Sequence, residues 1–319
     1  MKGTCFGASL ITKDLSLQGV SNKQFGVPTL DGGGNSGFAV LSISAVDRLT
    51  VAIDGLTITH GEIEGIFVDG YVGSTVSLTR TTVSDNNGSG IDGLFSTVTL
   101  TDSTVSGNAG FGLVGDRVGF GLLRSNVTDN GGLGIGSGFS FVSVADSTVS
   151  GNGLGGIGSE LDGNVYLSGS TVSGNHGPGI QLFSASVSLA NSSVGGNTTS
   201  GAGGGIYAFE GGGDLTNSTV TGNTAGQNGG GIYMAPGSFR LNNSTVSGNT
   251  AGGNGGGIYL TSASSDPHAD RLDRKRQHRS QRRRHLQRRG LGHAHRDEQL
   301  LRECPRRLRR SRRLLAPGS

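Results

Sequence analysis

The hexapeptide STVSGN stands at 103–108, 147–152, 170–175 and 244–249, and these four copies decide the fold. Looser copies stand at 81–86 (TTVSDN), 125–130 (SNVTDN), 192–197 (SSVGGN) and 218–223 (STVTGN). Eight related hexapeptides in one chain indicate a repeat architecture, with one copy in each structural unit, and not a single active site.

Three apolar columns keep step with the Asn that ends each hexapeptide. A Leu or Val stands eight residues before the Asn and a Val three before it. An Ile or Leu follows five residues after the Asn in the first five copies and nine after it in the last three. The four-residue insertion carries GGGIY at 203–207, 229–233 and 255–259. The Asn column consists of Asn86, Asn108, Asn130, Asn152, Asn175, Asn197, Asn223 and Asn249.

The spacing of the apolar runs predicts a β-solenoid. Successive Asn residues are 22, 22, 22, 23, 22, 26 and 26 residues apart, and the three apolar runs in each repeat have the length of strands and not of helices. Coils of three strands would stack at about 4.8 Å, and stacking would bury the apolar face that no coil buries alone. We therefore expect an all-β parallel β-helix of about ten coils over residues 1–265, with the Asn side chains forming a hydrogen-bonded structural ladder.

The composition changes near Ser265. Residues 1–265 carry 8 Lys+Arg against 17 Asp+Glu, a net charge of −9, whereas residues 266–319 carry 18 against 6, a net charge of +12. We predict that residues 266–319 form a disordered, Arg-rich tail. Its charge would attract polyanions without specificity, and no aromatic residue follows Ser265 to stack on bases. We therefore expect no specific nucleic-acid partner.

The tail has the composition expected of a segment translated in a shifted reading frame. With a suitable choice of codons, residues 266–281 read one nucleotide forward encode ILTLTGSTVSGNTAAN, which restores a complete coil with its Leu, Val and Asn columns. The sequence therefore predicts that the tail is a frameshift product.

Each GGGIY repeat follows a VSGN, VGGN or VTGN segment, and this combination is the basis of a family resemblance. In these motifs the chain resembles the right-handed parallel β-helix proteins of the pectate-lyase-like superfamily. Among these it resembles the bacterial surface proteins with polymorphic-outer-membrane-type repeats. The resemblance covers about Ile11 to Thr261 and implies a right-handed helix and an extracellular or cell-surface location. We find no signal peptide at residues 1–10 and no apolar run of about 18 residues that would cross a membrane.

One set of candidate ligand-binding residues stands six residues before successive Asn residues. We expect these alternating charges to form an ion-pair ladder that registers the coils, with a sugar-binding strip as the alternative. The set consists of Arg80, Asp102, Arg124 and Asp146.

A second set, Glu62, Glu64 and Asp69, crowds the loop after Gly61. In polysaccharide lyases of the resembled superfamily, acidic residues bind Ca²⁺ and an Arg or Lys acts as the base. No Arg accompanies these acids within their coil, so we interpret them as a solvated loop. We expect no cofactor, with Ca²⁺ implied only if the chain is a lyase, and we assign no catalytic residue.

The segment SDPHAD at 265–270 is similar to the Asp-Pro-His-Glu motif of alginate epimerases. It lacks the Glu and lies at the predicted change of frame, so we predict no catalytic role for it.

The favoured function is a non-catalytic β-helix of a secreted or cell-surface protein that contacts polysaccharides or cell-surface glycans, as a monomer or as a fragment of a larger chain. The alternative is a carbohydrate-active enzyme, either a polysaccharide lyase or an epimerase. Proteins of one fold carry many functions, so the fold alone does not decide between them.

Overall fold

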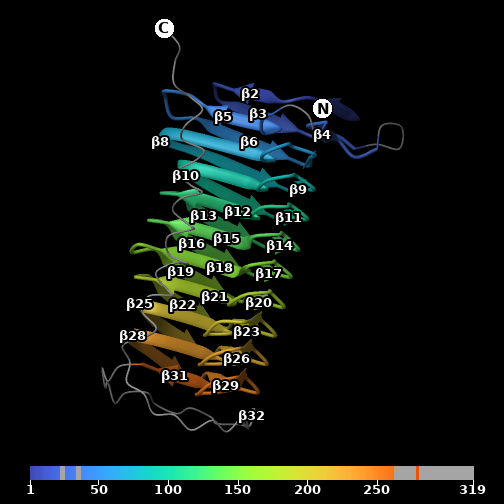
Figure 1. The fold of residues 1–319 in the computed structure, drawn as a ribbon. Helices are drawn as coiled ribbons and strands as arrows, with labels where there is room; N and C mark the ends of the chain where they lie inside the picture. Colours follow the sequence, from blue (N-terminus) through green and yellow to red (C-terminus); the bar gives the residue numbers. More distant parts are fainter. Residues whose placement is uncertain (22–25, 34–36, 262–277, 280–319) are drawn as a thin grey trace. The chain divides into compact units, whose positions relative to one another are not determined.

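The computed structural model describes residues 1–21, 26–33, 37–261 and 278–279, and residues up to 261 form a stack of β-coils (Figure 1). All strand pairings in these residues are parallel, and adjacent strands belong to successive coils. The predicted all-β solenoid is confirmed. The predicted disorder and frameshift origin of 266–319 concern residues outside those described, apart from 278–279.

The first face is a sheet of eleven strands of three residues each, and it contains the Val of every hexapeptide. Its strands are β1 (Thr4–Phe6), β4 (Thr29–Asp31), β7 (Thr57–Thr59), β9 (Thr82–Ser84), β11 (Thr104–Ser106), β14 (Asn126–Thr128), β17 (Thr148–Ser150), β20 (Thr171–Ser173), β23 (Ser193–Gly195), β26 (Thr219–Thr221) and β29 (Thr245–Ser247).

The second face follows the Asn and contains the Ile column. Its strands are β2 (Ser9–Ile11), β5 (Leu41–Ser44), the first parts of β8 (Ile66–Thr79) and β10 (Ile91–Thr101), β12 (Leu113–Asp116), β15 (Leu133–Gly138), β18 (Gly155–Glu160), β21 (Ile180–Phe183), the first parts of β25 (Ile206–Thr216) and β28 (Ile232–Asn242), and β31 (Ile258–Leu260).

The third face contains the Leu column and leads back to the next hexapeptide. Its strands are β3 (Leu15–Gln18), β6 (Thr50–Asp54), the second parts of β8 and β10, β13 (Gly119–Leu123), β16 (Phe141–Ala145), β19 (Asn164–Ser168), β22 (Ser186–Ala190), and the second parts of β25 and β28.

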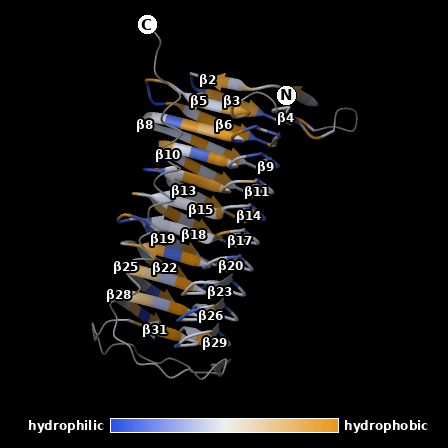
Figure 2. Cartoon of the chain, in the orientation of Figure 1, coloured by the Kyte–Doolittle hydropathy of each residue, from blue (hydrophilic) through white to orange (hydrophobic). Residues whose placement is uncertain are grey.

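The three apolar columns point into the coils and form one continuous core. In the coil that contains β10 and β11, Ile91, Leu100 and Val105 are each at most 1% exposed. The hydrophobic residues are accordingly spread along the whole stack of strands (Figure 2). Each such side chain stabilises the stack by about 1.5–3 kcal/mol relative to an exposed one.

The Asn column forms a buried ladder along the first corner, between the first and second faces. From Asn86 to Asn223, each Nδ2 donates to the Oδ1 of the Asn one coil further on, at 2.7–3.0 Å. The same Oδ1 accepts the backbone N–H of the preceding Asn. At the start of the ladder, the Gly61 N–H donates to Asn86 at 2.8 Å, as expected for a coil with Gly in the Asn position.

A second ladder, of buried hydroxyls, follows the third corner, between the third and first faces. The Ser103 N–H donates to Ser125 Oγ at 3.1 Å, and the Ser125 N–H donates to Ser147 Oγ at 2.9 Å. Each Oγ also donates to a carbonyl two residues earlier, such as that of Thr101. The first Ser or Thr of every hexapeptide therefore has a structural role that our sequence analysis missed.

A column of glycines makes room for the Asn ladder. One Gly stands directly before each Ile or Leu of the second face, from Gly65 to Gly231. A Cβ on Gly134 would lie 2.6 Å from Val149 Cγ1 and 2.7 Å from Asn152 Nδ2. Any larger residue at these positions would push the next coil away from its ladder.

We expect Gly134→Ala to destabilise the β-helix by about 1–3 kcal/mol, because the added methyl group overpacks a filled core. Gly121→Ala is the matched control, since a Cβ there would meet only Thr99 Cγ2 at an ordinary 3.4 Å. Thermal unfolding followed by circular dichroism compares the two, and equal melting temperatures would contradict this account of the glycine column.

The four-residue insertions add a fourth, short sheet. It consists of β24 (Thr198–Thr199), β27 (Thr224–Ala225), β30 (Thr250–Ala251) and β32 (His278–Arg279). In the last pairing, His278 lies opposite Thr250 and Arg279 lies opposite Ala251. The shifted frame would place Thr and Ala at these two positions, the same pair as in β27 and β30.

We therefore propose that the natural coding sequence continues in the shifted frame after Ser265. Sequencing the gene and its transcript should show an uninterrupted frame that encodes one further STVSGN coil. A nucleotide sequence without that second frame would refute the proposal.

Candidate functional site

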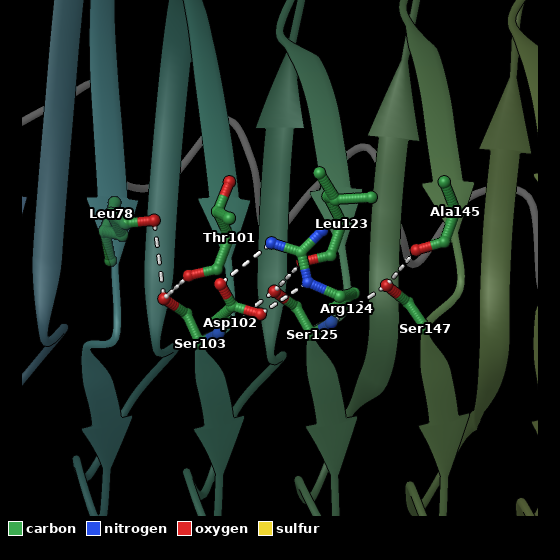
Figure 3. Close-up of polar contacts among 9 residues, drawn as sticks. All are labelled: Leu78, Thr101, Asp102, Ser103, Leu123, Arg124, Ser125, Ala145 and Ser147. Atoms are coloured by element: carbon green, nitrogen blue, oxygen red, sulfur yellow. Dashed lines mark hydrogen bonds and ion pairs between the residues drawn. The ribbon is translucent and has the colours of Figure 1, made fainter.

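The third corner brings the first candidate set together. Each coil turns there at one residue in the left-handed conformation, with φ between 47° and 58° from Arg80 to Asn243, so successive side chains stand in a row. Arg124 Nε and Nη2 donate to Asp102 Oδ1 and Oδ2 at 2.7 and 2.9 Å (Figure 3). Arg80 pairs with Asp54 at 2.5 Å, an acid that our sequence analysis did not single out.

The remainder of this row is also engaged within the protein. The carboxylate of Asp146 lies over Gly169 of the next coil, where an added Cβ would be 2.5 Å from Oδ1. Beyond it, Asn243 donates to Asn217 at 2.8 Å and Asn217 donates to Asn191 at 3.3 Å. These contacts support coil registration, and a ligand role for Arg80, Asp102, Arg124 and Asp146 stays a prediction.

The structure separates the acids of the second set. Glu62 is exposed and accepts the Gly37 N–H. Asp69 lies on β8, where burial raises the pKa of its carboxyl. Glu64 lies beside Asp92, a residue on the outer side of β10. Our sequence analysis did not identify Asp92 as a candidate.

Glu64 and Asp92 form a shielded carboxyl pair. Burial, together with the charge of Asp92, raises the pKa of Glu64 to about 7, and burial raises the pKa of Asp92 to about 7. Asp92 Oδ1 is buried without a hydrogen-bond partner. None of the ion pairs in the described part of the chain involves either residue. Two neighbouring carboxyls in such surroundings retain protons near neutral pH.

The loop geometry accounts for this pairing. The residue two positions before the Ile column lies against an outward position one coil further on. A Cβ on Gly136 would be 3.4 Å from the ring of Phe111, and one on Gly158 would be 2.7 Å from Leu133. Glu64 occupies the same loop position and meets Asp92 in this way. In the described residues, no group of three or more acids, His or Cys is placed to hold a metal ion.

We expect the stability of the β-helix to fall between about pH 4 and pH 7. Both carboxyls have raised pKa values when folded, so the folded state binds more protons than the unfolded state, and stability is lost as the pH rises through this window. Asp92→Asn should raise the melting temperature at pH 8 and flatten its decline from pH 4. Asp214→Asn, an exposed acid on β25, is the control. An unchanged pH profile in Asp92→Asn would contradict the pairing.

A groove runs along the second corner, between the second and third faces, and continues onto the third face. It has a volume of about 1060 Å³, and glycines without side chains form much of its floor. Its lining consists of Asp162, Gly163, Asn164, Ser184, Ala185, Ser186, Glu210, Gly211, Gly212, Gly213, Pro236, Gly237 and Ser238. None of these residues is basic.

The polar groups of the groove are held by one another across coils. Ser186 Oγ donates to Asn164 Oδ1, and Ser184 Oγ donates to Glu210 Oε2 at 3.1 Å. Asp162 and Glu210 are exposed. The groove therefore offers carboxylate, amide and hydroxyl groups in fixed positions.

Three exposed aromatic residues stand beside the groove, and we call them the aromatic platform. They are Phe139, Phe141 and Tyr166, with exposed fractions of 50%, 57% and 50%. Phe141 lies opposite Asn164 in the strand register. Arg117 packs over Phe139 at 5.2 Å and so steadies one ring of the platform.

The other aromatic row serves the scaffold. Tyr207 and Tyr233 stack at 5.1 Å, and Tyr233 and Tyr259 stack at 5.8 Å. Their ring faces are turned toward each other, so they are unavailable to a flat ligand. Such a row adds about 0.5–1.5 kcal/mol per pair to coil stacking.

Our sequence analysis assigned no site to the groove or to the platform. The available signal was the placement of aromatic residues at outward strand positions in a chain that is only 5% aromatic. The SDPHAD segment lies outside the described residues. No helix suited to crossing a membrane occurs in the described part of the chain.

Comparisons with known proteins agree with the fold. Residues 120–271 match the family model described as a right handed beta helix region. No curated protein matches the chain.

Several solved structures match the chain at low sequence identity and with TM-scores below 0.5. The A-module of a mannuronan C-5 epimerase from Azotobacter vinelandii is 12% identical, with a TM-score of 0.32, over 84% of this chain and 90% of that one. A pectate lyase is 14% identical, with a TM-score of 0.32, over 76% and 68%. The DFA-IIIase of Arthrobacter chlorophenolicus A6 without its lid is 14% identical, with a TM-score of 0.34, over 76% and 81%.

Proposed function

We propose that this right-handed β-helix is a non-catalytic scaffold of a secreted or cell-surface protein, and that it contacts glycan chains along the groove of the second corner. The observation that supports this most directly is the aromatic platform beside a polar, open groove. Ligand sites commonly combine aromatic surface with a few fixed polar groups.

The strand register suits an extended chain. Phe141, Asn164 and Ser186 occupy equivalent positions on successive coils, and Ser238 continues the row two coils later. Each coil advances about 4.8 Å along the axis. A polysaccharide laid along the axis would meet the platform with its apolar C–H surface and the groove with its hydroxyl groups.

The positions of the acids favour binding over catalysis. A general acid for glycoside cleavage needs a shielded carboxyl that stays protonated near neutral pH. The groove carboxylates Asp162 and Glu210 are exposed. The shielded pair Glu64 and Asp92 belongs to earlier coils and does not line the groove. Burial also raises the pKa of Glu160, which ends β18 in the coil of Asp162 and is not part of the lining.

The alternative function, a polysaccharide lyase or epimerase, would rest on the shielded pair Glu64 and Asp92, which has pKa values suited to proton transfer. Such a lyase would need a basic group at the pair, with Ca²⁺ as its implied cofactor. Incubation with pectin and alginate, with and without Ca²⁺, separates the functions. Unsaturated or epimerised products that are lost in Asp92→Asn would establish the enzyme.

We expect the purified protein to bind oligosaccharides, and Phe141→Ala to weaken binding about tenfold, a change of about 1.4 kcal/mol. Thr97→Ala is the matched control, because Thr97 is exposed in the same strand column two coils earlier. A glycan array followed by calorimetry on the bound ligands provides the measurement. Absence of binding to every glycan would overturn the proposed function.

A further inference from the structure

We infer that the groove selects neutral glycans and rejects polyuronates. This inference rests on the proposed function and specifies its ligand class. It depends on the signs of the charges along the groove and on the way its carboxylates are held.

Every charged residue that lines the groove is acidic. Asp162 and Glu210 stand at equivalent corner positions two coils apart, both in the left-handed conformation and both exposed. Asp214 is a further exposed acid on the outer side of the same third-face segment of β25. A chain that crosses the groove along the axis therefore passes a carboxylate at its first coil and another at its third.

The described cations near the groove do not offset these acids within it. Arg240 lies opposite Asp214 in the strand register and lies outside the lining. Arg117 stands beyond the platform, where it packs between Phe95 and Phe139 and lies 3.8 Å from Asp116. Both therefore have acidic neighbours of their own.

A polyuronate carries a carboxylate on every sugar, so it cannot pass both groove acids without like charges approaching closely. Two coils span about 9.6 Å, and the screening length at physiological ionic strength is about 8 Å. At least one sugar carboxylate would lie within that length of a groove acid.

The same carboxylates suit a neutral sugar. A carboxylate accepts hydrogen bonds from hydroxyl groups, and such charge-assisted bonds are stronger than neutral ones. Ser184 already donates to Glu210 and orients it, while Ser186 orients Asn164. A neutral glycan would complete the remaining acceptor positions without introducing charge.

Calorimetry with neutral hexasaccharides (cello-, xylo- and mannohexaose) and with hexamers of galacturonate and mannuronate tests the inference. We expect at least one neutral ligand to bind about tenfold or more tightly than either uronate, because like charges brought together at a binding surface oppose association. Added salt should weaken the discrimination, since it screens the repulsion and leaves neutral binding unchanged.

The double variant Asp162→Asn/Glu210→Gln keeps the shape of the groove and one acceptor oxygen at each position, and it replaces the other oxygen by an amide donor. It should gain uronate affinity by about fivefold or more and lose part of its affinity for neutral glycans, because charge-assisted hydrogen bonds become neutral ones. Asp85→Asn, an exposed acid at the first corner, is the matched control and should change neither.

The outcomes separate the two proposals. Uronate binding equal to or tighter than neutral binding would overturn the charge selection and leave the glycan-contact function standing. A double variant with no gain for uronates would also overturn it. Absence of binding by all ligands would instead overturn the proposed function itself.

Discussion

The buried hydrogen bond from one Asn to the next coil is the constraint on which the structure depends. The Oδ1 of each Asn accepts hydrogen bonds from both the side-chain Nδ2 and the backbone N–H of the preceding Asn. An unpaired member would cost about 1–3 kcal/mol, so the ladder fixes the register of every coil at once. The Gly beside each Asn, such as Gly134, leaves the space that this close stacking requires.

The corners turn this registration into rows of surface side chains. A single left-handed residue at each turn places equivalent side chains side by side, whatever their chemistry. The third corner holds charge pairs such as Asp102 and Arg124, and then an amide row. The second corner holds Arg117 between two Phe rings, and then the acids of the groove. The scaffold is therefore constant while its outer rows are free to acquire function.

The shielded pair Glu64 and Asp92 and the open groove lie on different coils, and this separation shapes the functional conclusion. Glu64 and Asp92 are paired by a loop that folds onto the next coil, whereas the groove exists because glycines replace side chains on three later coils. Proton transfer and ligand contact would have to coincide for catalysis, because a general acid must reach the bond that it cleaves. The arrangement fits a surface that holds a glycan.

The sequence by itself determined the periodicity, the inward columns, the Asn ladder and the position of the insertion. Residues that repeat with the period of the coil must occupy equivalent positions in every coil, and so they stack on one another along the axis. The Ser ladder and the glycine column were present in the same alignment, yet their role depends on contacts between coils. Only the tertiary structure decided the partnership of Glu64 with Asp92, of Arg80 with Asp54, and of the Phe141 ring with Gly119 of the preceding coil. These contacts depend on how each loop and corner side chain crosses to the neighbouring coil, and the apolar repeat does not specify that direction.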